Sequence, residues 1–263
     1  MNFVLFVIKM YRNLFRDSNF LYTRIIAFRV LIKYLSSKKK LIMIPLKDIN
    51  PARRFPFVNI TIIALNIIIF FYQSLHGQAI EQFIYRYALI PFNVTANFAV
   101  TLTHPNLLIT FFTSLFLHGS FFHLAGNMLY LWVFGDNIED KLGHIRFIIF
   151  YLLCGIVATA AHIAIDPTSK IPVIGASGAI SGVLGAYAIL FPHARVVTLI
   201  PIFIFIQLAE LPALLLLGFW FVIQFLNGIV SLGISESGGV AWWAHIGGFI
   251  AGILIIKPMR RYK

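Results

Sequence analysis

Long apolar stretches separated by short polar segments run through most of this chain. A membrane-spanning helix needs about 20 predominantly apolar residues, and six stretches approach that length. They lie at about 57–72, 121–134, 145–165, 177–191, 211–230 and 240–256. The pattern predicts an all-α, polytopic membrane protein built from a bundle of six transmembrane helices.

A further apolar stretch, 196–208, is harder to interpret. It contains Pro201, and Pro212 follows it. Half a span is one interpretation. We interpret the stretch as an interfacial connector, because a full span here would make seven and would place the C-terminus outside.

The composition excludes an ordinary soluble domain. Of the 263 residues, 60% are hydrophobic and 11% are charged, against about 45–50% and 25% in typical soluble proteins. A formal net charge of +12 is compatible with binding to nucleic acid or to an anionic membrane surface. The apolar composition favours the lipid bilayer as partner, and we expect no nucleic acid. The single cysteine, Cys154, excludes an internal disulfide framework.

The distribution of positive charge predicts the orientation, since cytoplasmic flanks of spans are rich in Lys and Arg. Six spans place both termini on one side, and the external side keeps only Arg86 and Lys170. The terminal side carries Lys38, Lys39, Lys40, Lys47, Arg53, Arg54, Lys141, Arg146, Arg195, Lys257, Arg260, Arg261 and Lys263. We therefore expect both termini to be cytoplasmic, in a prokaryotic plasma membrane.

The N-terminal residues differ in character from the rest. Within them, 20–35 is apolar but carries Arg24, Arg29 and Lys33, which suits a basic helix lying in the membrane interface. Translation that begins at Met43 is the alternative. We divide the chain into a basic cytoplasmic or interfacial segment, 1–50, and a six-helix membrane domain, 51–263.

Gly175-Ala176-Ser177-Gly178 is the first candidate for chemistry. Ser177 falls where a helical pattern begins, and the free N–H groups and dipole of a helix N-terminus favour an oxyanion next to the serine oxygen. The alternative is packing, because Gly178, Gly182 and Gly185 form a small-residue helix face. Both interpretations can hold together.

His245 is the matching candidate for a general base. An ionisable side chain inside a span indicates function, and Gly248 and Gly252 share its helix face. That face therefore contacts another helix instead of lipid. A histidine that only hydrogen-bonds a carbonyl within the bundle is the alternative.

His118, His123 and Asn127 form the third motif. His123 and Asn127 are four residues apart, so both can point to one site and donate hydrogen bonds to an oxyanion. Two alternatives are polar pairing within the bundle and a metal site that includes His118, His123, His245 and Asp136. The metal interpretation is weaker because the chain has no His-Glu-x-x-His and Asn is a poor zinc ligand. We expect no metal and no cofactor.

Together the three motifs resemble those of the rhomboid family of intramembrane serine proteases, over about 43–256. The family patterns H-x-x-x-x-H-x-x-x-N, G-x-S-G and A-H-x-x-G-x-x-x-G match His118 to Asn127, Gly175 to Gly178 and Ala244 to Gly252. The resemblance implies that Ser177 and His245 form a catalytic dyad. It implies that His123, Asn127 and the Ser177 backbone N–H bind the oxyanion. It also implies structural roles for His118 and Glu139.

The chain departs from the family pattern at two points. It has Ser181 where members often carry an aromatic residue that packs on the base, and it lacks the Trp-Arg pair that some members have in the first external loop. The loop 231–239, rich in Gly and Ser, is either a mobile cap or a simple connection.

The resemblance implies an endopeptidase that cleaves single-span or polytopic membrane proteins near the external face. The rival hypothesis is a non-proteolytic relative that binds or chaperones transmembrane segments. Such relatives usually lack the serine or the histidine, whereas this chain has both. The sequence leaves the substrate and the oligomeric state undetermined.

Overall fold

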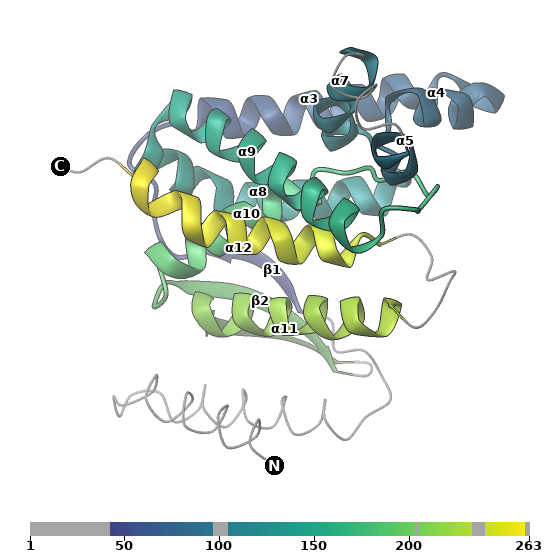
Figure 1. Cartoon of the computed structure of the whole chain (residues 1–263). Helices are drawn as coiled ribbons and strands as arrows, with labels where there is room; N and C mark the ends of the chain where they lie inside the picture. The colour runs from purple at the N-terminus through teal and green to yellow at the C-terminus, as the bar shows by residue number, and fades with distance from the viewer. Residues whose placement is uncertain (1–42, 97–104, 203–204, 233–239, 261–263) are drawn as a thin grey trace, which may run out of the picture.

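Helices make up most of the fold, and a small sheet lies along one side of them (Figure 1). The computed structural model describes residues 43–96, 105–202, 205–232 and 240–260. The proposed interfacial helix at 20–35 and most of the loop 231–239 lie outside these residues. The helical elements are α3 (Phe57–Ser74), η2 (Gly77–Ala79), α4 (Ile80–Tyr87), α5 (Pro91–Thr95), α7 (Pro105–Thr113), η3 (Ser114–Phe116), α8 (Phe121–Leu142), α9 (His144–Ile165), α10 (Ser177–Leu190), α11 (Ala213–Ser231) and α12 (Trp242–Met259).

The helices agree with the predicted apolar stretches. Within the described residues, α3, α9, α11 and α12 are each long and apolar enough to cross a bilayer. A further pair, Asn106–Phe116 and Phe121–Leu142, passes the same test together but bends by 80° at the break. The predicted all-α, polytopic membrane fold is confirmed in its helical bundle, to which the structure adds a small three-stranded sheet. The count of six spans stays a prediction, because α10 is apolar but has only 14 residues.

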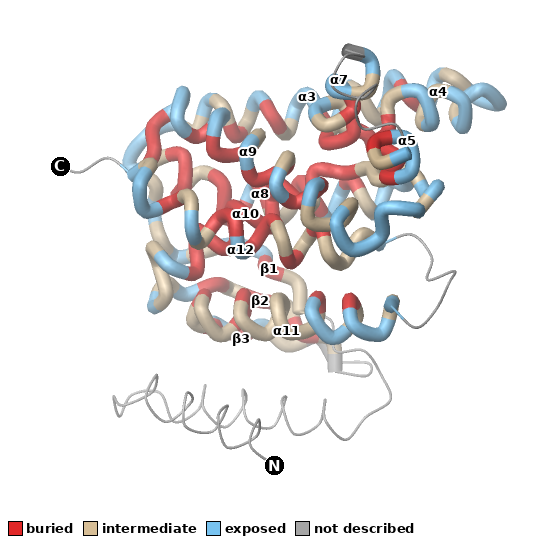
Figure 2. Tube along the Cα trace, in the orientation of Figure 1, coloured by how far each residue is buried: buried red, intermediate tan, exposed pale blue. Residues whose placement is uncertain are grey.

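Helix α10 lies at the centre of the bundle, where every residue from Gly178 to Ala188 is buried (Figure 2). It packs against α8, α9 and α12. Small residues make this possible: a Cβ on Gly248 or Gly252 of α12 would collide with the carbonyl oxygen of Gly178 or Gly182. The two backbones are therefore in direct contact, as small-residue faces allow in membrane helices.

The stretch 196–208 belongs to a β-hairpin, a form that we did not predict. It is a connector as expected, but it consists of β2 (Arg195–Ile202) and β3 (Phe205–Pro212), paired antiparallel from Arg195 opposite Pro212 to Ile202 opposite Phe205. Val196, Thr198 and Ile200 are buried in alternation, so one face of β2 packs on the bundle. The β-branched residues favour a strand.

A third strand, β1 (Ile44–Asp48), pairs antiparallel with β2 and gives the sheet order β1-β2-β3. Ile44 lies opposite Leu199, and a bulge follows between Pro45 and Lys47. These residues come from the segment 1–50, which we separated from the membrane domain. They are nevertheless paired with the folded body of the protein.

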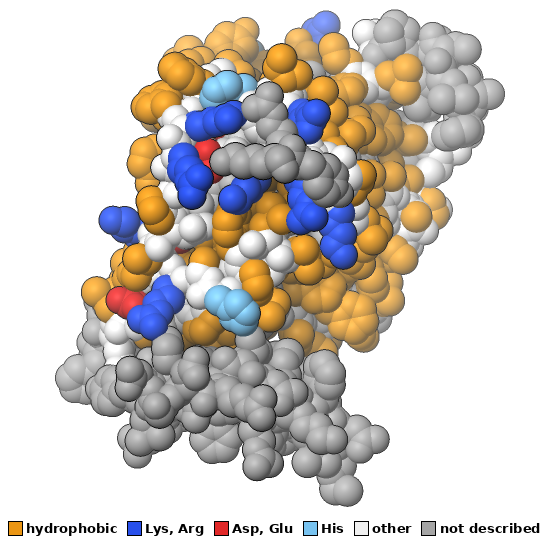
Figure 3. All heavy atoms as spheres, turned by 90° about the vertical axis from the view of Figure 1, so that its left-hand side faces the viewer, with side chains coloured by type: hydrophobic (Ala, Val, Ile, Leu, Met, Phe, Trp, Pro, Cys, Tyr) orange, Lys and Arg blue, Asp and Glu red, His pale blue; other side chains and the backbone are white. Residues whose placement is uncertain are grey.

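Positive charge gathers at the end of the bundle shown in Figure 3. The start of α3, the junction of α8 with α9 and the end of α12 meet there. Glu139 accepts hydrogen bonds from the backbone of Val58 and Asn59, and Arg146 donates to the carbonyl of Met259. The exposed cations on these segments are Arg53, Arg54, Lys141, Arg146, Lys257 and Arg260. This end corresponds to the predicted cytoplasmic face.

Candidate active site

Ser177 and His245 are in direct hydrogen-bonding contact although 68 residues separate them. Ser177 is the first residue of α10 and His245 lies in the first turn of α12. The Ser177 Oγ and the His245 Nε2 are 2.8 Å apart. This distance allows the imidazole to accept the hydroxyl proton, as an activated serine nucleophile requires.

The loop before Ser177 is held by backbone contacts to other parts of the chain. Leu89 and Val173 form an isolated antiparallel bridge, and the Gly175 N–H donates to the Ser114 carbonyl at 2.9 Å. Gly175 has a φ of +117°, a conformation that only glycine adopts readily. The loop therefore presents Ser177, at the N-terminus of α10, to the cavity.

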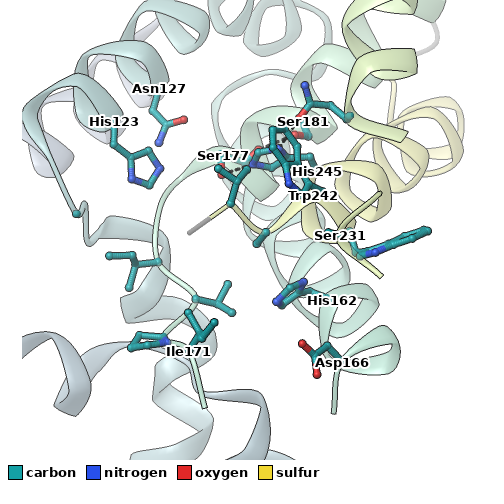
Figure 4. Close-up of a pocket in the computed structure, with 18 of the residues that line it drawn as sticks. His123, Asn127, His162, Asp166, Ile171, Ser177, Ser181, Ser231, Trp242 and His245 are labelled. Atoms are coloured by element: carbon teal, nitrogen blue, oxygen red, sulfur yellow. Dashed lines mark hydrogen bonds between the residues drawn. The ribbon is translucent and has the colours of Figure 1, made fainter. Parts of the chain in front are cut away.

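His123 and Asn127 of α8 lie across the cavity from Ser177 and His245 (Figure 4). They approach the backbone of Gly175 closely. A Cβ on Gly175 would come within 2.7 Å of the His123 Nε2 and 3.6 Å of the Asn127 Nδ2. The arrangement places these two side-chain donors on the same cavity as Ser177. Their spacing and the family resemblance both predicted them as donors to an oxyanion.

His118 lies behind Asn127 and not in the cavity. It is fully buried, and its Nε2 accepts a hydrogen bond from the Asn127 Nδ2 at 2.9 Å. The side-chain amide of Gln73 in α3 donates to the His118 carbonyl and accepts from its N–H. His118 thus connects the loop before α8 to α3 through Gln73 and contacts the side chain of Asn127.

The cavity has a volume of about 1180 Å³, and its lining includes Ser177, His245, His123 and Asn127. His162 of α9 and Asp166, which directly follows this helix, line another wall (Figure 4). Polar lining of this kind lets water reach membrane depth.

Two residues that we did not predict contact His245 from α11. Nδ1 of His245 lies 2.8 Å from the Oε1 of Gln224, and the ring of Trp220 lies 6.0 Å from the imidazole between centroids. Trp242 of α12 contacts the imidazole edge-on at 6.1 Å. The sequence signal for Gln224 was an amide within an apolar span, which is costly unless it finds a partner.

The remaining predicted residues lie away from the reacting atoms. Gly178, Gly248 and Gly252 mediate the contact of α10 with α12. Glu139 is 2% exposed and accepts hydrogen bonds from the first turn of α3, at the opposite end of α8. Ser181 donates to the Ser177 carbonyl at 2.7 Å.

Metal ligands do not converge in the part of the chain that the structure describes. No group of three or more His, Cys, Asp or Glu residues there is placed to hold an ion. The chemistry that the described side chains offer is acid–base and nucleophilic.

Comparisons with known proteins agree with the motif resemblance. A family model described as the Rhomboid domain matches residues 105–262. Rhomboid protein 1, mitochondrial, of Saccharomyces cerevisiae is 32% identical over 151 residues, which cover 54% of this chain and 39% of that protein. Presenilin-associated rhomboid-like protein, mitochondrial, of Homo sapiens is 30% identical over 149 residues, covering 53% and 35%.

A bacterial relative is also similar. Rhomboid protease GluP of Bacillus subtilis is 35% identical over 124 residues, covering 47% of this chain and 22% of that protein. The matches span less than two fifths of the length of these relatives. The yeast and human relatives are mitochondrial proteins. Our expectation of a prokaryotic plasma membrane is therefore not supported. The chain is an integral, multi-pass membrane protein.

Proposed function

We propose that this chain, which belongs to the rhomboid family, is a serine endopeptidase that cleaves membrane proteins within the bilayer. The observation that carries the proposal is the 2.8 Å contact of the Ser177 Oγ with the His245 Nε2 inside a polar cavity. A histidine and a serine paired in this way at membrane depth are expensive to bury, and a catalytic dyad explains both.

The first half of the reaction forms an acyl-enzyme. The Ser177 oxygen attacks the scissile carbonyl carbon while its proton passes to the His245 Nε2. The carbonyl oxygen becomes an oxyanion. The C–N bond then breaks, and His245 returns the proton to the leaving amine.

The second half releases the enzyme. A water molecule from the cavity attacks the acyl carbon, His245 accepts its proton, and the proton returns to the Ser177 oxygen as the ester bond breaks. The products are a carboxylic acid and an amine. The cycle uses no metal and no cofactor.

His123, Asn127 and the Ser177 N–H are the proposed oxyanion donors. His123 and Asn127 approach Gly175 from α8, and the N–H belongs to the first turn of α10. Donors fixed in advance act on charge as it develops in the transition state, which is where they accelerate the reaction. The proposed role of His118 is to orient Asn127, and that of Glu139 is to hold α3 against α8.

The proposed substrates are single-span or polytopic membrane proteins. We place the cut near the external face, because Lys141, Arg146 and Lys257 mark the other end of the bundle as cytoplasmic. With that orientation both termini are cytoplasmic. The basic segment 1–50 and the membrane domain 51–263 remain our proposed division of the chain.

Covalent labelling tests the proposal. Purified protein in detergent should react with a fluorophosphonate probe at Ser177, and the Ser177→Ala variant should not. Cleavage of a model single-span substrate in liposomes should disappear in the same variant. Substantial cleavage by Ser177→Ala would refute the serine mechanism. Binding of a transmembrane segment by wild-type protein, without labelling or cleavage, would instead favour the non-proteolytic rival.

A further inference from the structure

We infer that Gln224 and Trp220 of α11 position the catalytic base, and that Gln224 is the positioning residue of a Ser177–His245–Gln224 triad. This inference rests on the proposed function. None of the three sequence motifs contains a residue of α11. The inference gives this helix a role in the chemistry.

The hydrogen bond determines which nitrogen of His245 carries the proton. To accept the Ser177 proton, Nε2 must be bare, so the ring proton must sit on Nδ1. The Oε1 of Gln224 lies 2.8 Å from Nδ1 and can accept only from an N–H. The contact therefore favours the one neutral tautomer that can act as a base towards Ser177.

The same contact gains strength during the reaction. When His245 takes the proton it becomes an imidazolium, and a hydrogen bond from a charged donor is stronger than one from a neutral donor. Gln224 is only 6% exposed, so little water competes for Nδ1. A neutral amide also fills this position in the Cys-His-Asn sites of papain-like proteases.

Trp220 supplies the second part of the support. It lies one turn before Gln224 on α11, so the two side chains leave the same helix face. Its ring lies 6.0 Å from the imidazole at an interplanar angle of 34°. Ser181, which occupies the position where relatives often have an aromatic residue, bonds to the Ser177 carbonyl instead. The aromatic neighbours of the base here come from α11 and from Trp242.

The variants Gln224→Met and Gln224→Glu test the inference. Met keeps the shape but removes the acceptor, and it should lower the fluorophosphonate labelling rate and kcat by about 10- to 100-fold with KM nearly unchanged. Glu keeps an acceptor and adds a negative charge that stabilises the imidazolium. In the Gln224→Glu variant, the acidic limb of the pH–rate profile should therefore move to higher pH. His123 and His162, the other histidines of the cavity, are unchanged in both variants.

Asn66→Leu is the matched control. Asn66 is a fully buried amide in α3 that bonds to the Ile62 carbonyl, away from the cavity. The Asn66→Leu variant should keep the wild-type labelling rate and the wild-type pH profile. Wild-type labelling by Gln224→Met, or an unshifted pH profile in Gln224→Glu, would overturn the inference.

Histidine tautomers give a readout that does not depend on protease activity. In protein labelled with ¹⁵N-histidine, the His245 resonances should report Nδ1–H in wild type and a gain of the Nε2–H form in Gln224→Met. An unchanged tautomer ratio would contradict the role of Gln224, whatever the activity. A wild-type protein with the Nδ1–H form but no Ser177 labelling would refute the proposed function alone.

Discussion

The Nδ2 of Asn127 lies 2.9 Å from the Nε2 of His118, and both side chains are buried. One amide proton is thus directed at His118, which leaves the second free to point into the cavity. His118 lies outside the cavity and holds Asn127 in position, whereas Asn127 lines the cavity and can contact the substrate. This division leads to the first prediction.

Asn127→Ala should lower kcat by about 100- to 1000-fold and leave KM nearly unchanged, as expected when an oxyanion donor is lost. His118→Phe should lower kcat by a smaller factor, because Asn127 is then present but less well oriented. In the Asn127→Ala background the His118 change should add little, since the two residues act as one unit. Wild-type kcat in Asn127→Ala would remove it from the oxyanion role.

Gly175→Ala should impair catalysis through His123. A Cβ there would lie 2.7 Å from the His123 Nε2, and the φ of +117° is strained for any other residue. His123 must move away, so kcat should fall by a factor similar to the loss of a donor. Gly218→Ala on α11 is the control, because its Cβ meets nothing within 4 Å. Equal activity of the two variants would contradict the proposed geometry.

Stability should depend on pH through Asp48 of β1. Burial, together with the charge of Asp136, raises the pKa of Asp48 to about 6, against the hydrogen bond from Tyr187, which lowers it. An unfolded aspartate has a pKa of about 3.9, so between these values the folded state binds more protons than the unfolded state. The contribution is fully present below about pH 4 and is lost as the pH rises through about 6.

Thermal unfolding in detergent across this range checks the Asp48 prediction. The wild-type protein should lose stability from about pH 4 to 6, and Asp48→Asn should show a flatter profile because it cannot ionise. Asn keeps an acceptor for the Tyr187 hydroxyl and for Asn137, which both now bond to the Asp48 Oδ2. An identical slope in the two proteins would exclude Asp48 as its source.

Reporter fusions test the orientation. Fusions after Lys263 and near Lys141 should read cytoplasmic, and fusions near Arg86 and Lys170 should read external, because the cations gather at one end. A fusion within the β2–β3 hairpin should read on the same side as Lys141. An external reading after Lys263 would require an additional crossing and would overturn the predicted topology.

The sequence by itself was sufficient for the apolar helices and for the motif residues. Apolar length and periodicity are local properties, so the predicted starts at 57, 121, 145 and 177 agree with the structure to within one residue. Helix α8 runs eight residues past its predicted end at Phe134. Its polar end is stable because Asn137 bonds to Asp48 and Glu139 to the start of α3. Those partners lie about 80–90 residues away, and local pattern does not show them.

Only the tertiary structure showed the distances at which the polar residues meet and added Gln224 to them. Ser177 comes within 2.8 Å of His245 because glycines let α10 and α12 touch, and this distance follows from packing, not from spacing. Gln224 was one amide in an apolar run until the fold placed it at Nδ1 of His245. The 196–208 stretch became a hairpin through pairing with residues 44–48. Contacts between distant segments are properties of the assembled core, since each side chain gains a partner only when both elements are in place.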